Sequence, residues 1–151
     1  RSRCDSPTSG AVASVRELSS GPGRMLVFVY GVFAVAATGR SAIQLGTEAG
    51  NAPFAYTLSL VAAVIYLVAT TCLLLGGPSA WRVAVVSCVV ELAGVLSIGV
   101  LSYVDTELFP DKTVWSHFGQ GYAFLPLILP FLGLAWLRVT APGRKAARPV
   151  P

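Results

Sequence analysis

The sequence has few charged side chains. Of its 151 residues, 7 are Asp or Glu and 11 are Lys or Arg, so charged residues make up 12% of the chain. A soluble domain carries about 25% charged residues. Because 54% of the residues are hydrophobic, the chain has too few polar side chains to cover a water-exposed surface. The composition therefore predicts a protein whose solvent is a lipid bilayer.

Cysteine and histidine are also scarce. The chain contains three cysteines and one histidine, which are Cys4, Cys72, Cys88 and His117. No CxxC pair occurs, and the cysteine spacing matches neither a disulfide framework nor a metal site. Acidic residues precede His117 in the same loop, but their spacing matches no pattern of metal ligands; they are Asp105, Glu107 and Asp111. We expect no bound metal.

The sequence patterns of common enzymes and nucleic-acid-binding proteins are missing. There is neither a GxGxxG nor a GxxxxGK[ST] phosphate loop. Ser116 stands beside His117, but one such neighbour does not make a catalytic triad. The basic residues are grouped in short tails, which disfavours nucleic acid as a partner. These patterns predict a protein that is not an enzyme and has no cofactor.

Long apolar runs dominate what is present. Each run has at least the ~20 residues needed to cross the hydrocarbon core of a bilayer. Glycine- and proline-containing turns separate the runs, for example Gly76-Gly77-Pro78-Ser79. The sequence therefore predicts an all-α, four-helix transmembrane bundle over residues 25–139, with spans at about 25–47, 53–75, 81–104 and 117–139.

The basic residues predict the orientation of these spans. They concentrate in three places, which are the N-terminal tail (Arg1, Arg3, Arg16, Arg24), the second connection (Arg82) and the C-terminal end (Arg138, Arg144, Lys145, Arg148). The other two connections hold Lys112 and several acids. The positive-inside rule then places both termini in the cytoplasm, and the expected location is a bacterial plasma membrane. Aromatic belts would place Trp81 and Trp136 at the inner interface and Trp115 at the outer one.

The two ends of the chain have low sequence complexity. Residues 1–24 are rich in Ser, Gly and Arg, and residues 140–151 are rich in Pro, Ala and Arg. Neither end can bury enough apolar surface to fold by itself, so both are predicted to be disordered, basic tails. The single methionine, Met25, directly precedes the first apolar run. Two interpretations stay open, a trimmed N-terminus and a true start at Met25.

Arg40 and Glu91 are ionisable residues inside apolar runs. A charge in hydrocarbon costs several kcal/mol, so each residue needs a partner, a water-filled cavity or a function. At 1.5 Å per residue, Glu91 falls near the bilayer midplane and Arg40 in the outer half. A long arginine side chain can bridge part of that difference. The pair is predicted either to form a structural ion pair or to line a proton or ligand path.

Further polar residues are predicted to lie near this pair. Gln44 follows Arg40 by one helical turn, and His117 and Gln120 begin the fourth run. On continuous helices these side chains would form a polar cluster in the outer half of the bundle. Small residues recur at four-residue spacing, which favours close helix contacts; they are Ala34, Thr38, Ala42 and Ala55, Ser59, Ala63.

Three segments carry a family resemblance. They are residues 39–45 (GRSAIQL), 52–59 (APFAYTLS) and 113–122 (TVWSHFGQGY), the last followed by Pro126 and Pro130. Over most of residues 25–137 the chain resembles a family of small four-span integral membrane proteins of actinobacteria. The resemblance implies a membrane location and this topology, but no activity.

These observations lead to three functional hypotheses. The favoured one is a small, non-enzymatic integral membrane protein that serves as an accessory or assembly subunit, with lipid, other membrane proteins or further copies of itself as partners. The alternative is an oligomeric small transporter or channel in which Arg40 and Glu91 line a polar path. A membrane enzyme that uses the outer polar cluster is the least favoured.

Overall fold

The described part of the chain is helical. The computed structural model describes residues 21–47, 50, 52–107, 109 and 111–141. Its elements are α2 (Pro22–Thr47), α3 (Pro53–Leu75), α4 (Pro78–Val104), the 3-10 helix η1 (Ser116–Tyr122) and α5 (Leu125–Val139). The predicted all-α class is confirmed for these residues. Most of the two predicted tails, residues 1–20 and 142–151, lies outside the described residues.

The helix ends follow from local sequence. α3 begins at Pro53 and α4 at Pro78, because a proline in the first turn has no N–H to leave unpaired and its fixed φ suits a helix. Gly76 ends α3 at φ 65°, and its N–H bonds the Cys72 carbonyl. Gly77 follows at φ 91°. Two adjacent glycines thus allow the sharp reversal between α3 and α4, because glycine adopts positive φ without steric strain.

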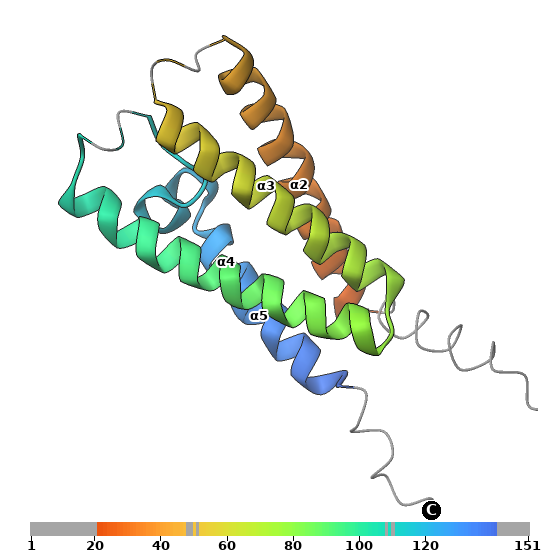
Figure 1. Ribbon diagram of the computed structural model, residues 1–151. Helices are drawn as coiled ribbons and strands as arrows, with labels where there is room; N and C mark the ends of the chain where they lie inside the picture. The colour runs from red at the N-terminus through yellow and green to blue at the C-terminus, as the bar shows by residue number, and fades with distance from the viewer. Residues whose placement is uncertain (1–20, 48–49, 51, 108, 110, 142–151) are drawn as a thin grey trace, which may run out of the picture.

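Successive helices run in opposite directions along the bundle (Figure 1). Around the bundle, α2 packs on α3, α3 on α4, α4 on α5, and α5 on α2. Helices α2 and α4 therefore lie diagonally across the interior. The described chain begins and ends at the same end of the bundle as the connection between α3 and α4 (Figure 1).

Three helices are long and apolar enough to cross a membrane. α2, α3 and α4 contain 26, 23 and 27 residues. At 1.5 Å per residue, each exceeds the ~30 Å thickness of a hydrocarbon core. The prediction of long apolar helices over the first three runs is therefore confirmed.

The prediction of one continuous helix over residues 117–139 is wrong. The chain forms η1 and α5 instead, and their axes are bent by 96°. α5 has 15 residues, which span only ~22 Å. Four non-glycine residues of this stretch have positive φ values, which are His117 and Phe118 inside η1 and Ala123 and Phe124 between η1 and α5. Pro126 then lies in the first turn of α5, where its missing N–H favours a new helix start.

The segment before this break packs into the bundle. We call residues 111–122 the docked segment. Two glycines of α4 make room for it, since a Cβ atom on Gly94 would lie 2.8 Å from Cη2 of Trp115 and one on Gly99 would collide with the ring of Phe118. Trp115 is only 3% exposed. The tryptophan predicted to lie at the outer interface is therefore enclosed by protein.

Candidate functional site

Glu91 lies halfway along α4 and is fully buried. Ser87, Ile98 and Ser102 of the same helix are buried with it. Helical spacing of about 3.6 residues places these side chains on one face. Glu91 is the acidic member of a face that otherwise carries small, hydroxyl or aliphatic side chains.

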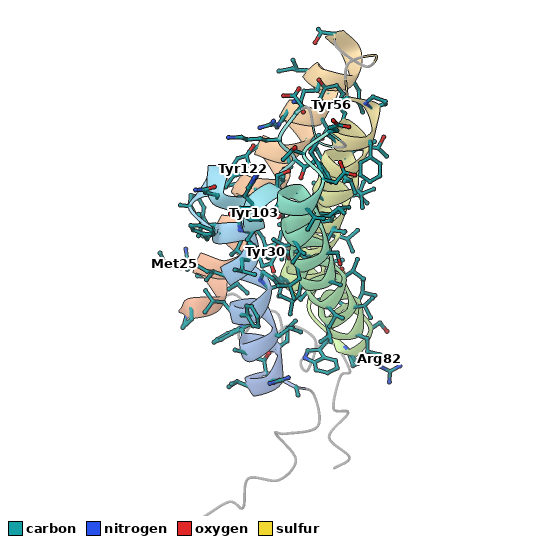
Figure 2. The ribbon with its side chains drawn as sticks, turned by 90° about the vertical axis from the view of Figure 1, so that its left-hand side faces the viewer. Met25, Tyr30, Tyr56, Arg82, Tyr103 and Tyr122 are labelled. Atoms are coloured by element: carbon teal, nitrogen blue, oxygen red, sulfur yellow. The ribbon has the colours of Figure 1, made fainter. Side chains whose placement is uncertain are left out.

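One oxygen of the Glu91 carboxyl is bonded across the diagonal of the bundle. The hydroxyl of Tyr30 on α2 donates to Glu91 Oε2 at 2.9 Å, and the same hydroxyl lies 3.5 Å from Cys88 Sγ. Figure 2 shows Tyr30 in the middle of the bundle. α5 passes close by, since a Cβ atom on Gly133 would lie 2.9 Å from Cys88 Sγ and 3.3 Å from the Tyr30 hydroxyl.

The Glu91 carboxyl also lies near the Tyr66 side chain of α3, which in turn lies near Trp115 of the docked segment. The Tyr66 hydroxyl interacts with the Glu91 carboxyl and with the Trp115 indole, although neither contact has full hydrogen-bond geometry. Glu91 Oε1, Tyr66 OH and Trp115 Nε1 are thus buried polar atoms without a hydrogen-bond partner among the described residues. Buried polar groups are nearly always bonded, so three such atoms in one place mark a site.

We call Tyr30, Tyr66, Cys88, Glu91 and Trp115 the Glu91 cluster. The rings of Tyr30 and Tyr66 lie 6.1 Å apart, and the side chains of both are fully buried. The cluster draws on α2, α3, α4 and the docked segment, and α5 closes it at Gly133. Within the described residues, no Lys, Arg or His side chain bonds Glu91. The cluster is therefore a carboxyl held by phenol, thiol and indole groups, without a positive partner.

Arg40 is bonded elsewhere. Its Nε donates to Gln44 Oε1 at 3.2 Å, and its Nη1 donates to the Tyr122 hydroxyl at 3.0 Å. Its Nη2 donates to the backbone carbonyl of Lys112 at 2.7 Å. Charge-assisted hydrogen bonds of this kind are among the stronger polar contacts in proteins. Arg40 thus ties the C-terminal half of α2 to both ends of the docked segment.

The predicted ion pair between Arg40 and Glu91 is therefore not formed within this chain. The prediction assumed that the two side chains had no nearer partners. The docked segment supplies them for Arg40, and Tyr30 supplies one for Glu91. The two residues belong to two separate polar groups, one at the outer end and one inside the bundle.

Other hydrogen bonds hold the docked segment in place. The Tyr56 hydroxyl of α3 donates to Asp111 Oδ2 at 2.6 Å. Midway along the segment, the His117 N–H donates to Ser102 Oγ of α4 at 2.8 Å. Tyr56 and Tyr122, the two anchoring tyrosines, lie toward the same end of the bundle in Figure 2. The segment is thus fastened to α2, α3 and α4.

The predicted polar cluster of the outer half is assembled only in part. Gln44 bonds Arg40 as expected. The His117 ring packs edge-on against the Tyr103 ring, with 4.5 Å between centroids, and Gln120 is exposed. The break between η1 and α5 turns both residues away from the helix face on which they were predicted to lie.

Sequence reasoning missed the two tyrosines that face Glu91. An aromatic residue inside an apolar run is usually a packing or lipid-facing residue, so Tyr30 and Tyr66 did not stand out. Their position was a usable signal, because tyrosines prefer the membrane interfaces and these two lie inside apolar runs. A buried tyrosine usually bonds through its hydroxyl, and an acidic residue at similar depth on another run is a suitable partner.

Comparisons of the chain with known protein families, with characterised proteins and with solved structures find no match. The fold and the site define a helical protein with three helices able to cross a membrane, or four if η1 and α5 form one broken span. Its chemistry rests on one buried carboxyl and the groups around it.

Removing the Tyr30 hydroxyl tests the geometry of the Glu91 cluster. We expect Tyr30→Phe to destabilise the bundle by about 1–3 kcal/mol, because it leaves a buried carboxyl oxygen unbonded. Tyr103→Phe is the matched control, since Tyr103 is exposed and its ring contact with His117 is kept. SDS-induced unfolding in mixed micelles measures both changes. Equal effects of the two substitutions would contradict the assigned hydrogen bond.

A double-mutant cycle separates the two polar groups. We expect the losses from Arg40→Ala and Glu91→Gln to add within about 0.5 kcal/mol, because the residues share no partner. Arg40→Ala and Tyr122→Phe should instead couple by about 1 kcal/mol, because their side chains are hydrogen bonded. The same unfolding assay gives both coupling energies. Strong coupling between Arg40 and Glu91 would contradict two separate polar groups and would support the ion pair predicted from the sequence.

Proposed function

We propose that this chain is a small, non-enzymatic integral membrane protein that acts as an accessory or assembly subunit. Its outer surface supports this role. Large apolar side chains are exposed on every long helix, for example Phe28 (70%), Leu75 (65%) and Val86 (60%). Such a surface suits lipid or the apolar faces of other membrane helices.

The outward face of α2 is the observation that carries the proposal. Gly39, Ala42 and Gly46 are exposed there. A Cβ atom on Gly39 or Gly46 would meet nothing within 4 Å, so neither glycine is needed for packing inside the bundle. In membranes, helices associate through small residues that let their backbones approach closely. The proposed occupant of this face is a helix of another membrane protein or of a second copy.

The proposal includes an orientation in a bacterial plasma membrane. Arg24, Arg82 and Arg138 are exposed at one end of the bundle, near the described ends of the chain. Figure 2 shows Arg82 at that end. Acidic residues follow α4 at the opposite end, including Asp105 and Glu107. The positive-inside rule then supports a cytoplasmic location for the arginine-bearing end and for both termini.

A second function, an oligomeric transporter or channel, is favoured by one observation. Glu91 Oε1 and the Tyr66 hydroxyl are buried and have no hydrogen-bond partner in the part of the chain that the structure describes, as expected of a site that binds a transported ion or solute. Against it, Arg40 is held by the docked segment, so the two charged residues do not line one path. Few helices are available for a monomeric transporter, so this function would require an oligomer.

Purification in mild detergent tests the proposed role. We expect a membrane protein to co-purify with the chain at fixed stoichiometry. Gly39→Leu and Ala42→Leu should abolish this association, because a branched side chain keeps the two helix backbones apart. Ala93→Leu, at an exposed position on α4, is the matched control and should leave it intact. Mass spectrometry identifies and counts the partner.

Two results would contradict the proposal. One is loss of the partner from the Ala93→Leu variant as readily as from the Gly39→Leu variant. The other is a preparation without a partner that, once reconstituted in vesicles, carries a proton or solute flux that Glu91→Gln abolishes. That second result would establish the transporter instead.

A further inference from the structure

The Glu91 cluster has an unmet requirement for positive charge. The Glu91 side chain is fully buried, and its Oε1 atom has no hydrogen-bond partner among the described residues. Enclosing an ionised carboxylate without a counter-charge costs several kcal/mol even after relaxation. Arg40, which was predicted to pair with Glu91, is instead held by Gln44, Tyr122 and the Lys112 carbonyl. The site therefore needs a cation from solution, and the smallest is a proton.

The groups facing the carboxyl distinguish a proton from a metal cation. The titratable groups around the carboxyl are Tyr30 from α2, Tyr66 from α3 and Cys88 from α4 itself. Behind them lie the Trp115 indole, which contacts Tyr66, and Gly133 of α5, which faces Cys88 and Tyr30. Tyr122 of the docked segment lies beyond Tyr66. Hard cations take at least six oxygen ligands, whereas the described residues of this site offer the oxygens of one carboxyl and two phenols.

The docked segment controls access to this carboxyl. Trp115 is enclosed over Gly94 and interacts with Tyr66, so the segment closes the cluster from the outer half of the bundle. The same segment is strained. His117 and Phe118 have φ values of 52° and 59°, and this left-handed backbone is sterically unfavourable for residues other than glycine.

This strain is held by a small number of contacts. They include the hydrogen bond from the His117 N–H to Ser102 and the packing of the Phe118 ring on Gly99. Strained backbone persists only where surrounding contacts determine it, and such places are often the parts of a structure that move. Opening the docked segment would release strain and expose the carboxyl to water.

We propose that the Glu91 cluster is a proton-binding site that is closed by the docked segment and exchanges its proton when that segment opens. The bound species is the neutral carboxyl, which can donate its proton to the Tyr66 hydroxyl while accepting from Tyr30. After deprotonation, the hydroxyls of both tyrosines can donate hydrogen bonds to the carboxylate. This inference goes beyond the accessory role, and because it concerns the isolated chain it holds whether or not a partner binds.

Infrared difference spectroscopy of the full chain in lipid nanodiscs tests the proton site. We expect a protonated-carboxyl band that is lost as the pH is raised and is absent from Glu91→Gln. If the folded bundle shows only a carboxylate band for Glu91 at every pH, the proposal is overturned. A shift of that carboxylate band on addition of sodium would then identify a metal-cation site. A protonated band that no pH change removes would also overturn it.

The rate at which this band shifts after transfer to deuterated water tests the closure. We expect Trp115→Ala to accelerate the shift about tenfold or more, because exchange of a buried group requires local opening. Trp136→Ala removes a half-buried indole at the other end of the bundle and is the matched control. Gly94→Ala, whose methyl group displaces the Trp115 ring, is a second variant if Trp115→Ala fails to fold. Unchanged exchange in the Trp115 and Gly94 variants would rule out control by the docked segment.

Discussion

The enclosure of one carboxyl within apolar helices is the constraint on which the rest of this structure depends. Glu91 is fully buried, so its hydrogen-bonding groups must come from protein, and each of its neighbours supplies part of them. Tyr30 reaches it across the bundle from α2, and Tyr66 faces it from α3. The absence of side chains at Gly94 and Gly133 lets the docked segment and α5 approach. The polar group thus determines where small residues are required.

The docked segment links this interior to the end of the bundle that carries Arg40. Its Trp115 belongs to the Glu91 cluster, while Lys112 and Tyr122 hold Arg40. The two charged residues therefore contact different parts of one segment, and no ion pair joins them within the described residues. Because they share no side-chain partner, a substitution that leaves the segment in place affects each polar group separately.

Much of the helical architecture could be predicted because hydrophobic length is a strong signal. The first three runs are long, apolar and bounded by Gly and Pro, and they form α2, α3 and α4. The prediction of one continuous fourth helix was wrong because it rested on the length of a mainly apolar run. The backbone conformation there is set instead by local glycines, by Pro126 and by contacts of the docked segment with α4.

Of the Glu91 cluster, only Glu91 itself was predicted as a site residue, and none of its partners was. Arg40 and Glu91 stand out because charges are rare in apolar runs. To predict their partners, one must know which helices are neighbours and how the docked segment packs. The periodicity of the sequence gives neither. Tyr30 and Tyr66 were overlooked because an aromatic ring in an apolar run fits lipid contact and buried hydrogen bonding equally well.

The accessibility of Trp115 tests the central claim most directly, because that residue closes the Glu91 cluster. A chain with Trp81→Phe and Trp136→Phe retains Trp115 as its single tryptophan, and its fluorescence can be quenched from water by iodide and from the bilayer by brominated lipids. The enclosed position, 3% exposed, predicts weak quenching by both. Strong quenching by lipids brominated near the headgroup would place Trp115 at the membrane interface and would contradict the docked segment and the closed cluster beneath it.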